Sequence, residues 1–270
     1  MAKQPQQHRA RKRFGQNFLQ DEGIIRRIVR SVSPQEGQHL VEIGPGMGAL
    51  TEVILEATDR LDVVELDRDL IPGLKVKFFN HKGFNIHQAD ALKFDFSTLV
   101  DDGQPLRIVG NLPYNISTPL IFHLLDQGPV VRDMHFMLQK EVVERLAAEP
   151  SSNDWGRLGI MAQYRCQVES LFLVPPEAFD PMPKVESAIV RLTPHKELPY
   201  PAKSFECFDT VVRSAFAQRR KTLRNNLKGL MEMSLLEALE IDPTRRPETL
   251  SLQEVVAISN AYADLQGKHD

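Results

Sequence analysis

Short apolar segments alternate with segments of helical periodicity over the first two thirds of the chain. Continuous or alternating apolar residues predict strands at residues 39–43, 61–65, 84–88, 106–110, 134–138 and 187–192. Apolar residues at helical spacing predict helices at residues 24–29 and 49–57. This alternation is typical of an α/β fold, in which helices cover both faces of a mostly parallel sheet.

The pattern changes after Pro194. Residues 194–203 form a linker that contains proline and lysine, and helical sequence follows. One side of the predicted helices is apolar, at Phe208, Val211, Val212, Ala215, Phe216, Leu223, Leu227 and Leu230. Ser251 and Glu254 have the spacing of a capping box before an apolar helix. We therefore expect two domains, residues 1–194 with an N-terminal arm, and a small all-helical domain of residues 195–270.

Charge is distributed unevenly along the chain. The 270 residues carry a formal net charge of −3, which gives no indication of a nucleic-acid partner. Four basic residues nevertheless lie between Arg9 and Arg13, and six basic residues and no acid lie between Arg213 and Lys228. Two such segments are compatible with a surface that contacts phosphates, although from charge alone a solvated surface is the simpler explanation.

Cysteine usage and hydropathy exclude several classes of protein. Cys166 and Cys207 are far apart and belong to no C-x-x-C pair, so neither a zinc site nor a disulfide framework is expected. The polar, basic start has no apolar segment of a secretory signal, and no apolar run is long enough to cross a bilayer. The sequence predicts a cytoplasmic protein that needs no metal and binds no membrane.

A glycine-rich loop, E-I-G-P-G-M-G, follows the first predicted strand and precedes a helix. Gly44 and Gly46 lack side chains, so the backbone can approach a ligand closely. Glu65 comes 21 residues after Gly44 at the end of the second strand. A carboxylate there can accept hydrogen bonds from both ribose hydroxyls of an adenosine. Asp90, at the end of the third strand, can accept a hydrogen bond from an adenine amino group.

Two classes of cofactor fit this arrangement. A dinucleotide needs a helix N-terminus that holds pyrophosphate, usually with the pattern G-x-G-x-x-G, and here Leu50 displaces the third small residue. S-adenosylmethionine has no phosphate, and the E-x-G-x-G form with Glu65 and Asp90 downstream resembles class I methyltransferases. A third interpretation, that Gly44 and Gly46 only shape a tight turn, leaves the two acids unexplained. We therefore expect S-adenosylmethionine.

The segment Asn111-Leu112-Pro113-Tyr114 directly follows the fourth strand, where open α/β sheets bind ligands. The N6 amine of adenine is a poor nucleophile, because its lone pair is delocalised into the ring. Two acceptors for its N–H bonds would favour a pyramidal amine: the Asn111 side-chain carbonyl and the backbone carbonyl of Leu112 or Pro113. Tyr114 offers a ring on which the base can stack. Catalysis would then consist of orientation and hydrogen-bond electrostatics.

The tetrad resembles the N/D-P-P-Y/F signature of amino-methyltransferases. A strand-end turn could carry the same residues by chance. A cytosine-C5 methyltransferase would need a nucleophilic cysteine, and none lies near Pro113. A second aromatic residue is expected on the other face of the base, and the rigid, proline-rich residues 175–183 present Phe179. The alternative is a plain rigid linker with Phe179 in the core.

Five segments together resemble one family, and they are residues 11–19, 42–46, 111–119, 137–142 and 175–190. They are similar to the KsgA-type small-subunit ribosomal RNA adenine dimethyltransferases. The similarity covers about residues 9–228, with weaker signals beyond. It implies a class I S-adenosylmethionine-dependent methyltransferase fold in residues 1–194 and an RNA-binding role for residues 195–270.

The resemblance also implies an activity: N6,N6-dimethylation of two adjacent adenines in the 3′-terminal hairpin loop of 16S rRNA. The substrate would be a small-subunit precursor, during ribosome biogenesis. Matching positions place six residues around the cofactor: Asn17, Leu19, Gly44, Glu65, Asp90 and Asn111. A monomeric protein is expected.

Basic residues are expected to contact rRNA phosphates. They are Arg11, Lys12 and Arg13 in the arm and Arg220, Lys221, Arg224 and Lys228 in the helical domain. If residues 213–228 form one helix, Arg213, Arg220, Arg224 and Lys228 project within a narrow sector. This stripe would be exposed, would take no part in internal ion pairs, and would position RNA rather than read its sequence.

Three alternatives stay open. The erythromycin-resistance 23S rRNA methyltransferases share the N-terminal motifs, although residues 139–143 and 218–222 look more like the small-subunit enzymes. A DNA or protein-glutamine amino-methyltransferase could use the same tetrad, but it would not explain the basic helical domain. A ribosome assembly factor without activity is the third, and the intact motif residues argue against it.

Overall fold

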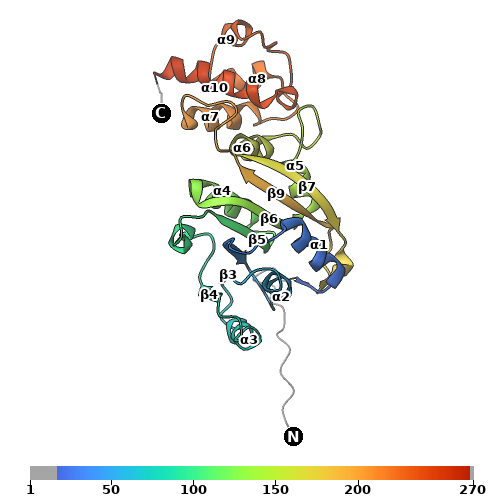
Figure 1. The fold of residues 1–270 in the computed structure, drawn as a ribbon. Helices are drawn as coiled ribbons and strands as arrows, with labels where there is room; N and C mark the ends of the chain where they lie inside the picture. Colours follow the sequence, from blue (N-terminus) through green and yellow to red (C-terminus); the bar gives the residue numbers. More distant parts are fainter. Residues whose placement is uncertain (1–16, 268–270) are drawn as a thin grey trace. The chain divides into compact units, whose positions relative to one another are not determined.

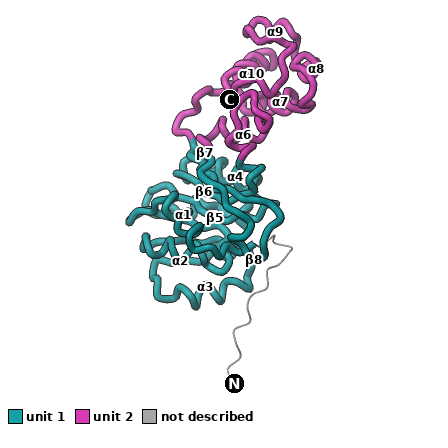
Figure 2. The backbone as a smooth tube through the Cα atoms, turned by 90° about the vertical axis from the view of Figure 1, so that its right-hand side faces the viewer, with its two compact units in different colours: residues 1–143, 169–194 teal, residues 144–168, 195–270 magenta. Residues whose placement is uncertain are grey.

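The computed structural model describes residues 17–267, which form two compact units. The first unit comprises Met1–Val143 and Glu169–Pro194, and the second comprises Glu144–Val168 and His195–Asp270 (Figure 2). The expected division at residue 194 therefore placed residues 144–168 on the wrong side. They belong to the second unit because helix α6 (Arg157–Arg165) packs into its core, where the ring of Tyr164 stacks on Phe208 at a centroid distance of 4.3 Å.

The first unit is built on a seven-stranded sheet with the strand order β4-β3-β2-β5-β6-β9-β7 (Figure 1). The strands are β2 (Leu40–Ile43), β3 (Leu61–Glu65), β4 (Phe84–Gln88), β5 (Leu106–Asn111), β6 (Val131–Gln139), β7 (Cys166–Val174) and β9 (Ser187–Pro194). Strands β2 to β6 are parallel, and β9 runs antiparallel to β6. The predicted class, a mostly parallel α/β sheet, is confirmed.

Helices flank this sheet (Figure 1). They are α1 (Glu22–Val32), α2 (Ala49–Leu55), α3 (Ile71–Lys77), α4 (Ser117–Asp126) and α5 (Lys140–Leu146), with short 3-10 helices at Phe96–Leu99, Gly128–Val130 and Pro176–Ala178. Strands β2 and β3 are buried along their whole length. Central strands of a sheet with helices on both faces are buried in this way, since neither face meets water. The buried strands give the site a rigid base.

A small second sheet attaches the N-terminal part of the chain to the first unit. Strand β1 (Phe18–Leu19) pairs antiparallel with β8 (Phe179–Asp180). The Asp21 side chain then caps α1 by accepting a hydrogen bond from the Ile24 N–H at 2.8 Å. The strand pairing and the cap together fix residues 17–21, although these residues are distant in sequence from their partners in β8.

The second unit is helical. Its helices are α6, α7 (Phe205–Ala215), α8 (Leu223–Leu227), α9 (Met233–Ala238) and α10 (Leu252–Gln266), with a 3-10 helix at Pro247–Thr249. The capping box at the start of α10 is confirmed, because Ser251 Oγ accepts from the Glu254 N–H and Glu254 Oε2 accepts from the Ser251 N–H. No helix in residues 17–267 is long and apolar enough to cross a membrane.

Residues 213–228 do not form one helix, which was the condition for the narrow basic sector. Helix α7 ends at Ala215, a turn follows, and α8 begins only at Leu223. The N–H groups of Leu223 and Arg224 donate to the backbone carbonyls of Arg245 and Pro243, at 2.8 and 2.9 Å. In a continuous helix these N–H groups would bond to carbonyls four residues earlier. The interruption thus depends on a segment about 20 residues further along the chain.

Candidate functional site

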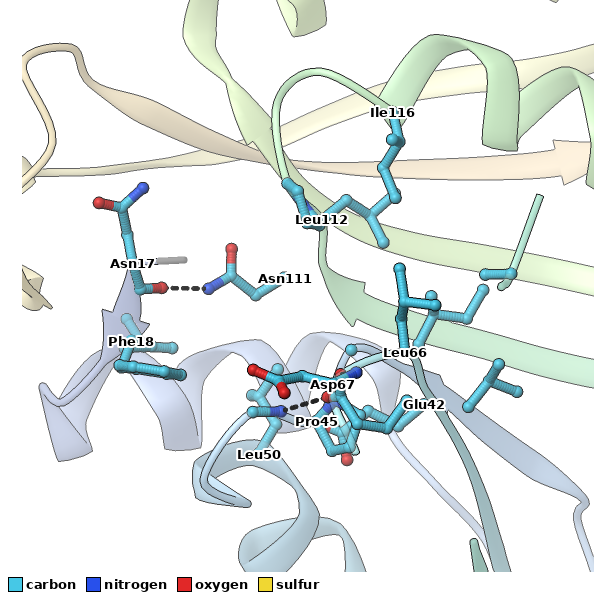
Figure 3. Close-up of a pocket in the computed structure, with 18 of the residues that line it drawn as sticks. Asn17, Phe18, Glu42, Pro45, Leu50, Leu66, Asp67, Asn111, Leu112 and Ile116 are labelled. Atoms are coloured by element: carbon cyan, nitrogen blue, oxygen red, sulfur yellow. Dashed lines mark hydrogen bonds between the residues drawn. The ribbon is translucent and has the colours of Figure 1, made fainter. Parts of the chain in front are cut away.

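A pocket with a volume of about 390 Å³ lies at the carboxyl ends of the parallel strands. Its lining comes from the residues that directly follow four strands, 44–47 after β2, 66–67 after β3, 89–91 after β4 and 112–116 after β5. Residues 17–19 complete it (Figure 3). The pocket contains the predicted cofactor residues and the tetrad: Asn17, Leu19, Gly44, Gly46, Glu65, Asp90, Asn111, Leu112, Pro113 and Tyr114.

The loop after β2 contains three glycines with positive φ angles, Gly44, Gly46 and Gly48. Gly44 and Gly46 have φ angles of 67° and 58°, in the left-handed region that residues with a side chain rarely adopt. A Cβ atom on Gly46 would also lie 3.1 Å from the ring of Phe18. These glycines therefore keep the loop backbone at the pocket wall, as the sequence predicted.

Glu65, the last residue of β3, is held by two backbone N–H groups. Its Oε1 accepts from Asp67 at 2.7 Å and its Oε2 accepts from Gly46 at 3.4 Å. Burial raises the pKa of this carboxyl above its usual range, although the backbone hydrogen bonds oppose the rise. A carboxylate has about four lone-pair positions, so each oxygen retains capacity for a further donor. The geometry suits the binding of a diol.

Asp90 stands two residues after β4 and lines the pocket. Its Oδ1 accepts a hydrogen bond from the Leu92 N–H at 3.0 Å. This bond fixes the carboxylate at the start of the next turn, and Oδ2 can accept from a ligand. The contact to an adenine amino group stays a prediction.

The orientation of the Asn111 amide follows from its hydrogen bond. Asn111 Nδ2 donates to the backbone carbonyl of Asn17 at 3.0 Å (Figure 3). Since a carbonyl oxygen only accepts, the NH₂ group must face Asn17, and the side-chain oxygen Oδ1 points away from it. Within residues 17–267 no donor reaches Oδ1. Oδ1 of the fixed amide can thus accept a hydrogen bond from a ligand in the pocket.

The two candidate backbone carbonyls of the tetrad, those of Leu112 and Pro113, differ in their hydrogen bonds. The Pro113 carbonyl already accepts a hydrogen bond from the Ile116 N–H at 3.1 Å, in the turn before α4. No donor within residues 17–267 reaches the Leu112 carbonyl. Leu112 is therefore the better second acceptor.

Phe179 does not reach the pocket. In β8 it pairs with Leu19 of β1, and both side chains are buried in the core, with exposed fractions of 5% and 6%. The structure thus shows the alternative, in which Phe179 packs in the core without a place beside the base. The register explains this position, because Phe179 lies opposite a residue whose side chain is already directed into the core. Phe18 is the aromatic residue of β1 that lines the pocket.

A buried acid that sequence reasoning had not assigned lies in the pocket wall. Glu42 of β2 is 1% exposed, and its Oε2 accepts from the Thr51 hydroxyl of α2 at 2.6 Å. Burial raises the pKa of Glu42 to about 7, although the Thr51 hydrogen bond opposes the rise. The available signal was a glutamate within an otherwise apolar strand.

Glu42 predicts a pH dependence of stability. Between its ordinary pKa of 4.5 and about 7, Glu42 keeps its proton in the folded protein and loses it in the unfolded chain. The free energy of unfolding is expected to fall as the pH rises through this window, because the unfolded chain then binds fewer protons. Glu42→Gln, which retains an acceptor for Thr51, should reduce the fall. Urea unfolding at several pH values measures it, and equal slopes for both proteins would contradict it.

The predicted basic residues lie in different environments. Arg220, Lys221, Arg224 and Lys228 are exposed, and no acid within residues 17–267 forms an ion pair with them. Arg213, however, pairs with Asp209 one turn earlier in α7, which corrects the expectation that it takes no part in ion pairs. Arg11, Lys12 and Arg13 lie outside the described residues. A group of histidine, cysteine or acidic residues that could hold a metal is also absent from residues 17–267.

A family model of ribosomal RNA adenine dimethylases matches residues 7–264. The chain belongs to the ribosomal RNA adenine dimethylase family. Its curated relatives include ribosomal RNA small subunit methyltransferase A of Pseudomonas aeruginosa, which is 64% identical over 261 residues, 97% of each chain. The corresponding protein of Chromohalobacter salexigens is 60% identical over 268 residues, 98% of this chain and 95% of that protein. The predicted family is thus confirmed.

Two solved structures extend the likeness of this adenine dimethylase to its fold. A dimethyladenosine transferase from Plasmodium falciparum has a TM-score of 0.80 at 25% identity, covering 93% of this chain and 99% of that one. The 23S rRNA methyltransferase ErmE has a TM-score of 0.73 at 22% identity, covering 91% and 99%, and shows a shared fold only.

Proposed function

We propose that this chain transfers methyl groups from S-adenosylmethionine to the N6 amines of two adjacent adenines in the 3′-terminal hairpin loop of 16S rRNA. The relatives with 60% identity or more are named for the small ribosomal subunit, which favours 16S over 23S rRNA. A small-subunit precursor is the proposed substrate, because an exposed, unassembled loop leaves its bases free to enter a pocket.

One observation favours S-adenosylmethionine over a dinucleotide. The ionisable side chains of the pocket lining within residues 17–267 include four acids, Glu42, Glu65, Asp67 and Asp90, but no lysine, arginine or histidine. An acidic lining is unfavourable for a pyrophosphate and favourable for a sulfonium cation. The acidic lining therefore supports S-adenosylmethionine as the ligand.

The residues present also fit the shape of S-adenosylmethionine. Glu65 would hold the two ribose hydroxyls, and Asp90 would accept from the adenine amine. The backbone around Gly44, with Asn17 and Leu19, would enclose the methionine moiety. When bound, S-adenosylmethionine supplies an electrophilic methyl group, so the protein need not first deprotonate the amine.

The chain itself would contribute orientation and electrostatics. Asn111 Oδ1 and the Leu112 carbonyl would accept hydrogen bonds from the two N–H groups of adenine N6. These two hydrogen bonds would direct the nitrogen lone pair out of the ring plane. Positive charge develops on this nitrogen as it is methylated, and both acceptors interact with it more strongly in the transition state. The ring of Tyr114 would hold the extruded base by stacking.

A competition between subunits tests this proposal. Under-methylated small subunits and large subunits are mixed, incubated with the chain and labelled S-adenosylmethionine, and the modified nucleotides are mapped. We expect label at two adjacent adenines of 16S rRNA. Label in 23S rRNA would favour the erythromycin-resistance type instead. Binding to small subunits without label would favour an assembly factor.

We also propose that the basic residues of the second unit contact rRNA phosphates. Arg220→Ala, Arg224→Ala and Lys228→Ala together should weaken binding to small subunits and flatten its salt dependence, since fewer counterions are released. The affinity for S-adenosylmethionine should be unchanged.

A matched control is the triple substitution of Arg30, Lys75 and Lys82 by alanine, because these exposed residues of the first unit carry the same total charge. Filter binding at several salt concentrations measures both variants. If the two triple variants have the same affinity and salt slope, the basic residues of the second unit are ordinary surface.

A further inference from the structure

Tyr114 lines the pocket, and its hydroxyl group is bonded to a residue outside the pocket lining. Its oxygen lies 2.9 Å from Ser187 Oγ, and the two hydroxyls form a hydrogen bond. Ser187 is fully buried, and it does not belong to the pocket lining. Tyr114 therefore belongs to the pocket lining, while its hydroxyl is held by a buried residue that does not.

Ser187 lies on a rigid part of the first unit. It is the first residue of β9 and pairs with Gln139 at the end of β6. The neighbouring Glu186 accepts hydrogen bonds from Lys140 at two points, with its backbone carbonyl at 3.0 Å and its carboxylate at 2.9 Å. Strand pairing and these two bonds hold the Ser187 hydroxyl in one place.

Tyr114, in contrast, lies in a turn between β5 and α4. A second buried serine holds the backbone of this turn, since Ser117 Oγ donates to the Tyr114 carbonyl at 3.2 Å. The two serines thus fix different parts of the residue, its backbone and the far end of its side chain. A tyrosine side chain has only two torsions that set the ring, so one bond at the hydroxyl restricts both.

We propose that Ser187 is a positioning residue for methyl transfer, whose hydroxyl holds the Tyr114 ring in the orientation in which the target adenine stacks. This inference rests on the proposed function. The Tyr114 hydroxyl then serves to anchor the ring and takes no part in proton transfer. Ser187 acts on the substrate only through Tyr114 and contacts neither base nor cofactor.

Loss of the hydrogen bond between Ser187 and Tyr114 is expected to lower kcat. Ser187→Ala and Tyr114→Phe each remove the same hydrogen bond from opposite sides, and each is expected to lower kcat about tenfold, the effect of one hydrogen bond of ordinary strength. The double variant should be no slower than either single variant, because the bond can be lost only once. The affinity for S-adenosylmethionine should stay within about twofold in all three, since Ser187 lies outside the pocket lining.

A matched control is Ser259→Ala in α10 of the second unit. Ser259 is also fully buried, but its hydroxyl has no hydrogen-bond partner within residues 17–267. This variant should keep the kcat of the unchanged protein, which shows that loss of a buried serine hydroxyl alone does not slow the reaction. Thermal unfolding of each variant shows whether it is folded, and Tyr114→Phe, which keeps the ring, tests the bond if Ser187→Ala is unstable.

Multiple-turnover methylation of under-methylated small subunits measures kcat for the unchanged protein, the two single variants and the double variant. A double variant that is slower by the product of the two single effects would overturn the proposal, as would an unchanged kcat for Ser187→Ala. Failure of the proposed function would look different, because the unchanged protein itself would then leave the small subunits unmethylated.

Discussion

Asn111→Ala is expected to lower kcat for rRNA methylation on the order of 10²-fold or more, the usual loss when one preorganised transition-state hydrogen bond is removed. The physical reason is the fixed amide: its NH₂ group is held by the Asn17 carbonyl, so Oδ1 is oriented for the amine before substrate arrives. The affinity for S-adenosylmethionine should change much less, because this interaction strengthens mainly in the transition state. Rapid-quench kinetics and calorimetric titration measure the two quantities.

Asn111→Asp is the informative companion, because it keeps the size of the side chain. A carboxylate cannot donate to the Asn17 carbonyl, which the Asn111 amide now contacts at 3.0 Å, and the two oxygens would repel each other. The aspartate is therefore expected to turn and to lose most of the activity, although it still offers acceptors. A near-normal turnover of Asn111→Ala would remove this residue from the catalytic site.

Glu65→Ala is expected to produce the largest loss of cofactor affinity. If the carboxylate accepts from both ribose hydroxyls, it forms charge-assisted hydrogen bonds, each of which contributes about 1.5–3 kcal/mol at most. We therefore expect the dissociation constant for S-adenosylmethionine to rise by about 10-fold or more. Calorimetric titration measures the affinity, and circular dichroism shows that the domain remains folded.

Glu65→Gln serves as the matched control for this prediction. It keeps the length of the side chain but places an NH₂ group against one of the N–H groups of Asp67 and Gly46, which now donate to the two carboxylate oxygens. It should therefore also weaken binding, although less than alanine does. An unchanged affinity in Glu65→Ala would exclude the residue from the cofactor site.

The features that could be predicted from the sequence are those determined by residues close together in the chain. Strand β4 was predicted at its observed bounds, Phe84–Gln88, because apolar Phe84 and Ile86 alternate with polar residues after the turn residue Gly83. The glycine loop was recognised from Gly44 and Gly46, whose positive φ angles leave little choice of residue. Asn111 was identified because its chemistry and its place at the end of a strand agree.

The features that were missed depend on contacts between distant segments. Phe179 packs in the core because β8 pairs with β1, which lies about 160 residues earlier. The helix interruption after Ala215 depends on carbonyls of residues 243 and 245. Residues 144–168 join the second unit through the packing of α6, whose own sequence gives little sign of its partner. Such pairings are set by tertiary structure, which overrides local preference.

A crystal structure of the chain with S-adenosylhomocysteine, the demethylated form of the proposed cofactor, would show directly where the cofactor binds. We expect the ligand to occupy the pocket at the carboxyl ends of β2 to β5, with both ribose hydroxyls on Glu65 and its adenine amine near Asp90. Its sulfur should face Asn111 Oδ1 across a space wide enough for an adenine amine. A ligand bound outside this pocket, or one whose sulfur faces away from Asn111, would contradict the account.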